Sequence, residues 1–141
     1  MRQIYLLDTN VISEFSKSKP NAAVMNHINE VKHLCAISAT VWEEITYGYE
    51  RLPEGKRKDY IKEFMESIHI AYEVLPYDEF SAQVCGEIQA SCKKQGITLQ
   101  KNDSQIAATA IANGMVLVTH NTADYSPIAE VSNLKYEDWW A

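Results

Sequence analysis

Short apolar runs, each bounded by polar or turn-forming residues, recur along the chain and predict the strands of one sheet. The first, residues 3–7, is too short for a helix, and the run at residues 115–119 is dense in Val and Leu. Three further runs lie at residues 34–38, 70–75 and 132–136, the last of which we expect at an edge of the sheet. The pattern therefore predicts a central sheet of four to five short strands.

Apolar residues at helical spacing fill the intervals between these runs. Val11, Ile12 and Phe15 predict a short helix capped by Asn10 and broken at residues 17–20. The other predicted helices are residues 21–31, 38 or 40 to 51, 56–68, 78–95, and 102 or 103 to the C-cap Gly114. Strands that alternate with helices predict a mostly parallel sheet covered on both faces. We therefore expect a helix-rich, three-layer α/β/α domain.

The composition is that of an ordinary globular protein and suggests one domain over residues 1–141. Of the 141 residues, 46% are hydrophobic and 23% are charged. No apolar stretch approaches the ~18 residues that span a membrane, and the run before Asp8 is too short for a signal peptide. We therefore expect a cytoplasmic protein with no membrane partner.

The net charge of −6 argues against a simple nucleic-acid-binding protein, since such proteins are more often basic. If the substrate is a polyanion, a metal ion and local basic residues have to overcome this negative field. Acidic residues interleave with the single basic stretch, which we therefore interpret as a solvated helical face: Arg51, Lys56, Arg57, Lys58 and Lys62.

The spacing of cysteines and histidines predicts no zinc site. Cys85 and Cys92 would share a helix face, but neither they nor Cys35 belong to a CxxC pair or a Cys/His cluster. We expect three buried free thiols. The histidines are scattered along the chain, at His27, His33, His69 and His120.

Four acidic residues are the candidates for chemistry, and each also has a simpler interpretation. Asp8 follows the first strand as a turn or cap residue would, and Glu44 could be a solvated helical side chain. Asp103 lies where a helix dipole favours an acid. Asp124 could form a turn before Tyr125.

The combination of these acids is more informative than any one of them. The strands before Asp8 and Asp124 are predicted to be neighbours, so their carboxylates should meet at the carboxyl edge of the sheet, where α/β folds bind ligands. Two carboxylates 4 Å apart repel by about 4 kcal/mol at an effective dielectric near 20. A hard divalent cation, Mg²⁺ or Mn²⁺, would offset this repulsion and act on phosphate esters.

Glu43 competes with Glu44 for the position that faces this cluster. Glu44 is three residues from Val41 and so lies nearer the inward edge of its helix. Gly48, one turn further on, weakens the helix and would be tolerated where a neighbouring backbone or side chain needs room.

Four motifs, in order, resemble those of the PIN-domain ribonucleases, and within them the VapC-type toxins of prokaryotic toxin–antitoxin modules. They are the apolar run into DTNVIS at residues 8–13, EITYG at 44–48, NDSQIAATA at 102–110 and VTHNTADY at 118–125. Their order and spacing agree with the family over nearly the whole chain. Tyr125 is a mild departure, since the family commonly has Phe there.

The resemblance implies a PIN-like fold and the roles of the site residues. The catalytic, metal-binding cluster would be Asp8, Glu44, Asp103 and Asp124, supported by Thr9, Asn10, Thr119 and Asn121. His120 would either contact phosphate or be an idle surface residue. The implied activity is that of an endoribonuclease toxin, which cleaves RNA phosphodiester bonds with water activated by Mg²⁺ or Mn²⁺.

The resemblance also implies two protein partners, a VapB-like antitoxin and a second copy of the chain in a homodimer. Trp42 and Tyr49, together with the helix at residues 56–68, are the surface we expect to make one of these contacts.

Other classes fit the sequence less well. A phosphatase of the haloacid-dehalogenase type needs Asp-x-Asp after its first strand, but Asn10 stands at the third position. The stretch around Ile37 lacks the Asp that a receiver domain phosphorylates, and no GxGxxG or Walker A run indicates a nucleotide cofactor. A non-catalytic RNA- or protein-binding module on the same fold is the remaining alternative.

Overall fold

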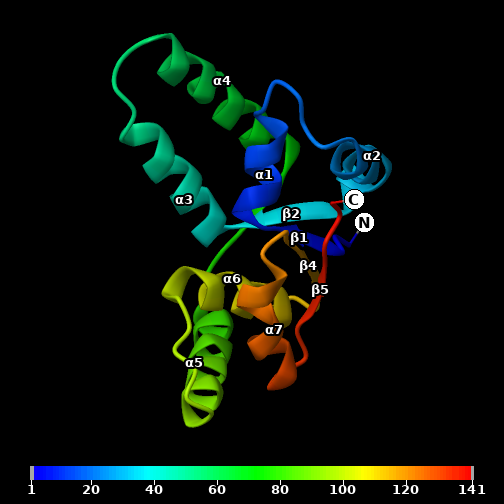
Figure 1. Ribbon diagram of the computed structural model, residues 1–141, viewed down its shortest axis with the longest axis vertical. Coiled ribbons are helices and arrows are strands. Elements are labelled where there is room, and N and C mark those ends of the chain that lie inside the picture. Colours follow the sequence, from blue (N-terminus) through cyan, green and yellow to red (C-terminus); the bar gives the residue numbers. More distant parts are fainter. Residues whose placement is uncertain (1, 141) are drawn as a thin grey trace.

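A five-stranded, all-parallel sheet forms the centre of the computed structural model, which describes residues 2–140 (Figure 1). Its strands lie side by side in the order β3-β2-β1-β4-β5. In chain order their bounds are β1 Tyr5–Leu7, β2 Cys35–Ser38, β3 Glu73–Leu75, β4 Val116–Val118 and β5 Lys135–Glu137. The expected sheet is confirmed, with β5 at one edge and β1 beside β4.

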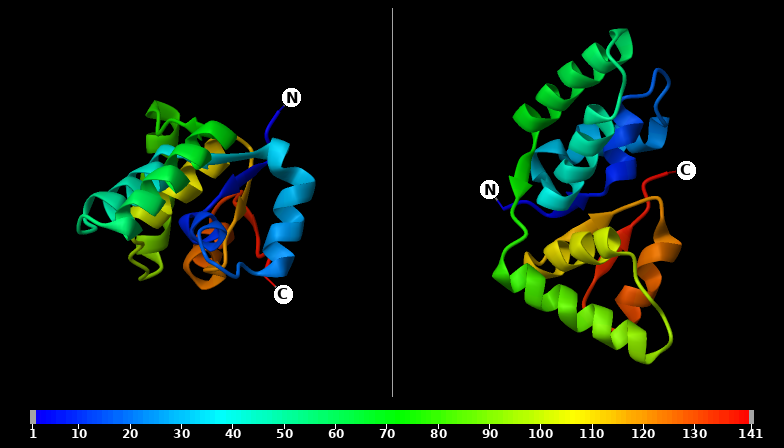
Figure 2. Two further views of the ribbon diagram at one scale, coloured as in Figure 1. Left: turned by 90° about the horizontal axis from the view of Figure 1, so that it is seen from above. Right: turned by 90° about the vertical axis from the view of Figure 1, so that its left-hand side faces the viewer.

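Seven α-helices in the described residues cover both faces of the sheet. They are α1 Thr9–Phe15, α2 Ala22–Val31, α3 Ala39–Glu50, α4 Lys56–Ala71, α5 Glu79–Lys94, α6 Lys101–Ala112 and α7 Thr122–Glu130, with a 3₁₀ turn at Lys32–Leu34. Figure 1 and the right-hand view of Figure 2 show α1–α4 on one side of the sheet and α5–α7 on the other. Right-handed crossovers produce this division, because the chain adds strands in one direction up to β3 and then returns to β4. The three-layer α/β/α architecture is thereby confirmed.

The core lies along the sheet and extends into both helical layers. Leu6, Leu7 and Leu117 are fully buried, as expected for strands covered on both faces. On α6, small residues such as Ala107 and Ala110 are also fully buried and allow close packing. The three cysteines are buried and free, which confirms that prediction. No helix of residues 2–140 has both the length and the apolar character needed to cross a membrane.

The N-terminal caps of two helices differ from the prediction. Asp8, not Asn10, caps α1, because its side chain accepts a hydrogen bond from the backbone N–H of Thr9 and the helix begins two residues earlier. The helix α6 begins at Lys101, so Asn102 and Asp103 lie inside its first turn and neither caps it. Neither side chain is therefore used to cap the helix, and both are free to make other contacts.

The helix α7 is absent from the sequence-based prediction, which expected a turn at Asp124. Pro127 normally signals the end of a helix, since it lacks an N–H and clashes with the preceding turn. Here it lies inside α7, which continues to Glu130. Elsewhere α4 extends past residue 68 to Ala71, and β3 is correspondingly shorter than predicted.

Candidate active site

The order of the strands places a crevice between β1 and β4. The chain adds β2 and β3 on one side of β1, and β4 and β5 on the other, so the direction of strand addition reverses at this pair. Open α/β sheets bind ligands at such a switch point, outside the carboxyl ends of the strands. Asp8 follows β1 and Thr119 follows β4, and the Asp8 N–H donates to the Val118 carbonyl at 2.9 Å.

Asp8 is buried, and hydrogen bonds fix both of its carboxylate oxygens. Its Oδ1 accepts from the Thr9 N–H at 2.8 Å. Its Oδ2 accepts from the Thr119 hydroxyl at 2.8 Å and from the Asn10 side-chain amide at 3.2 Å. The carboxylate is therefore held in one orientation at the switch point.

Thr119 and Asn10 connect this carboxylate to the loop after β4. The Thr119 hydroxyl accepts from the backbone N–H of Asn121 at 3.0 Å. The Asn10 Oδ1 accepts from the backbone N–H of His120 at 3.0 Å. This network holds the ends of β1 and β4 together, and Asn121 takes part in it through its backbone.

Glu44 reaches the same edge of the sheet from α3. The Thr9 hydroxyl donates to Glu44 Oε1 at 2.9 Å, so the residue after Asp8 connects the two acids. Glu43 is exposed and Glu44 is half-buried. The structure thus separates the two candidates, with Glu44 turned toward Asp8.

Asp103 and Asp124 approach from the first turns of α6 and α7. The Tyr125 hydroxyl donates to Asp103 Oδ1 at 3.4 Å, a long hydrogen bond. Asp103 is half-buried, whereas Asp124 is exposed. Asp124 therefore lies at the open side of the group.

The charges of the four carboxylates act on one another. Burial raises the pKa of Asp8 above its usual value. Burial is also the main cause of the raised pKa of Glu44, with a further contribution from the charges of Asp8 and Asp103. The pKa of Asp103 is raised by burial and then by the charges of Asp124 and Asp8. The arrangement therefore concentrates negative charge at the switch point.

The chemistry of these donors fits a hard divalent cation. Carboxylate oxygens are the preferred ligands of Mg²⁺ and Mn²⁺, and a cation would offset both the burial of these charges and the repulsion between them. As they stand, no three His, Cys, Asp or Glu side chains of residues 2–140 are close enough together to hold a metal ion. The residues that could hold a metal are thus identified by their donor chemistry and charge.

Two residues near the site have contacts that sequence reasoning missed. Tyr125 is 1% exposed, and its hydroxyl lies against Asp103 and Asp8. A Tyr where the family commonly has Phe was the available signal. His120 is not an idle surface residue, because its Nδ1 lies 3.1 Å from Asp138 and its ring stacks on Trp140 at 4.4 Å.

Comparison with known proteins agrees with this fold. Residues 5–130 match the model of the PIN domain. The VapC ribonuclease Y4jK of Sinorhizobium fredii is 33% identical over 124 residues, which cover 85% of this chain and 89% of the relative. The tRNA(fMet)-specific endonuclease VapC of Shigella flexneri is 33% identical over 137 residues, which cover 96% and 97%.

A solved structure extends this agreement to three dimensions. The DNA-bound VapBC structure from Salmonella typhimurium superposes with a TM-score of 0.83 at 27% identity, covering 97% of this chain and 98% of that chain. The chain belongs to the PIN-domain family and, within it, to the VapC-type ribonuclease toxins of toxin–antitoxin modules.

Proposed function

We propose that this chain is a Mg²⁺- or Mn²⁺-dependent endoribonuclease whose active site is formed by Asp8, Glu44, Asp103 and Asp124. The observation that carries the proposal is the buried carboxylate of Asp8 at the β1–β4 switch point, with its charge coupled to those of Glu44 and Asp103. If Asp8 served only to cap α1, the presence of three further acids near it would have no explanation.

The chain's own residues bind and position the reacting groups. The four carboxylates would hold the metal, and Thr119, Asn10 and Thr9 keep Asp8 and Glu44 in place through hydrogen bonds. When bound, the ion supplies positive charge for the phosphate and lowers the pKa of a water molecule. Catalysis then depends mostly on charge neutralisation and on positioning.

The test is cleavage of a fluorogenic RNA by the purified chain. We expect cleavage with Mg²⁺ or Mn²⁺, no cleavage with EDTA, and loss of at least about 100-fold in rate for Asp103→Asn. Cleavage at the same rate in EDTA would refute metal dependence. A folded chain that cleaves no RNA with any divalent ion would instead support the non-catalytic binding module.

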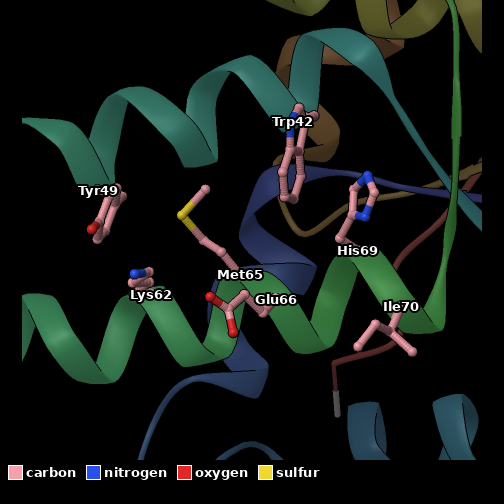
Figure 3. A pocket seen from close by; sticks show the side chains of 7 residues that line it. All are labelled: Trp42, Tyr49, Lys62, Met65, Glu66, His69 and Ile70. Carbon is pink, nitrogen blue, oxygen red and sulfur yellow. The ribbon is translucent and has the colours of Figure 1, made fainter.

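We further propose two protein partners, a VapB-like antitoxin and a second copy of this chain. The first follows from the toxin–antitoxin complexes to which the chain is structurally similar. A hollow of about 460 Å³ between α3 and α4 offers a docking surface, with Trp42, Tyr49 and Met65 on its walls (Figure 3). We propose it for one of these two contacts, because an exposed apolar hollow on a folded protein often marks an interaction site.

A further inference from the structure

A second groove leads away from the acidic residues, between α1, α3 and α4. It has a volume of about 470 Å³. Its lining includes Thr9 at the start of α1 and Glu44 on α3, and also Lys17 and Arg51, which follow the ends of these two helices, and Arg57 at the start of α4. A molecule held at the carboxylates can therefore continue into this groove without leaving the protein surface.

The groove also carries positive charge, in contrast to the chain as a whole, whose net charge is −6. An adjoining hollow of about 570 Å³ shares Lys17 and Arg57 with the groove and adds Lys19. Lys17 is neutralised by the buried Glu14, 2.8 Å away. Within residues 2–140, Lys19 and Arg57 have no ion-pair partner, and Arg51 lies over the Tyr47 ring at 5.7 Å. Three cations are thus available to an anionic ligand.

Gly48 leaves the wall of the groove without a side chain at one point of α3. It lines the groove inside α3, where glycine costs about 1 kcal/mol relative to alanine. A Cβ at this position would meet no atom within 4 Å. Neither a close backbone nor a crowded side chain requires this glycine, as is also the case for Gly86 in α5, so a side chain can be introduced here to narrow the groove.

We infer that this groove binds single-stranded RNA on one side of the phosphate that is cleaved. The inference rests on the proposed function, since it extends that site along the substrate. Phosphates of the strand would meet Lys19, Arg51 and Arg57, and bases would lie against apolar residues of the groove such as Ile45 and Phe64. RNA is favoured over a protein segment because Arg51 and Arg57 line the same groove as Glu44, which belongs to the site that must hold a phosphate.

The test is binding of a fluorescent, unpaired RNA of about 12 nucleotides, measured by anisotropy on the inactive Asp103→Asn chain. In that background, Lys19→Gln, Arg51→Gln and Arg57→Gln together should weaken binding at least about ten-fold and lower the slope of log K against log salt by about 2. The control chain carries Lys32→Gln, Lys93→Gln and Lys94→Gln, which change the net charge equally but do not line the groove. Equal effects in the two chains would overturn the inference.

Gly48 supplies a second test that does not alter charge. Gly48→Leu should leave the thermal unfolding temperature unchanged or higher, because α3 gains a better helix former and the side chain enters open space. The same change should weaken RNA binding several-fold. If Gly48→Leu binds RNA normally but no longer binds its antitoxin, the groove belongs to the protein partner and the inference is wrong.

These results are distinguishable from a failure of the proposed function. Cleavage by the unaltered chain tests the function, whereas RNA affinity of the inactive chain tests the groove. An unaltered chain that cleaves RNA while its affinity is insensitive to Arg57 and Gly48 would refute the groove alone.

Discussion

Individual side chains at the switch point determine which acids face it. The hydroxyl of Thr9 selects Glu44 over its neighbour, since Glu44 accepts its hydrogen bond and Glu43 remains exposed. Adjacent positions on one helix thus have different roles, and substitutions at these positions can test the assignment.

We expect Glu44→Gln to lower the rate of RNA cleavage at least about 100-fold, because it removes one charge from the acidic cluster. Glu43→Gln changes the net charge equally and should cleave at the normal rate. Single-turnover kinetics on the fluorogenic RNA measure both. Equal losses in the two variants would mean that the assignment of Glu44 is wrong.

Asp103 provides a pH-dependent prediction in the presence of EDTA. Burial and the charges of Asp124 and Asp8 raise its pKa in the folded chain, so the ionised carboxylate destabilises the fold. The stability that the protonated carboxyl contributes is therefore lost as pH rises through the folded pKa. Asp103→Asn should therefore melt about 3 °C higher than the unaltered chain at pH 7.5. The difference should narrow as pH falls through the raised folded pKa, and vanish only well below the ordinary value of 3.8, where the carboxyl is protonated in both states.

Thermal unfolding in EDTA across this pH range measures the effect. Glu43→Gln serves as the control and should show little change with pH relative to the unaltered chain. A melting temperature of Asp103→Asn that falls below that of the unaltered chain at pH 7.5 would contradict the repulsion we infer.

At the scale of helices and strands, sequence predicts periodicity better than it predicts ends. The apolar runs identified the inner strands β1, β2 and β4 because most of their residues are buried, whereas the edge strands β3 and β5 are more exposed. Caps were less predictable, since Asp8 and Asn10 are both good N-cap residues and only the start of the helix at Thr9 decides between them. The helix α7 escaped prediction because Pro127 signals a break, while Tyr125 and Ile128 bury the helix against the core.

The end of α6 gives a prediction about backbone conformation. Gly114 has φ of +65°, a left-handed conformation that costs a residue with a Cβ about 1–2 kcal/mol. Gly114→Ala should therefore lower the free energy of unfolding by about 1 kcal/mol. Gly86→Ala is the matched control: it lies inside α5 with nothing within 4 Å, and should raise stability by up to about 1 kcal/mol. Urea titration of both variants measures these opposite signs.

The topology of the whole molecule places four acids that are distant in sequence at the same edge of the sheet. Their sequence positions suggested the meeting, because β1 and β4 were predicted to be neighbours, and the pairing of Leu7 with Val118 confirms this. The contacts of the Tyr125 hydroxyl and the groove beyond Glu44 depend on how whole helices pack, and the only signal in the sequence was a Tyr where the family commonly has Phe. The basic stretch was interpreted as a solvated face, yet Arg51 and Arg57 line a groove.

The proposed self-association is also a property of the whole molecule. We expect light scattering at high concentration to give twice the mass of one chain. A particle of one chain's mass at every concentration tested would remove the homodimer from the proposal.

Asp8 both caps α1 and belongs to the acidic group. This double role matters when an inactive form of the toxin is to be made. Exchanging it for Asn would set an amide against the Asn10 amide and loosen the local architecture along with the chemistry. Among residues 2–140, Asp103 accepts a single long hydrogen bond, from Tyr125. Substitution of Asp103 should therefore disturb the fold less, and it is the better way to produce an inactive protein alone or with its partner.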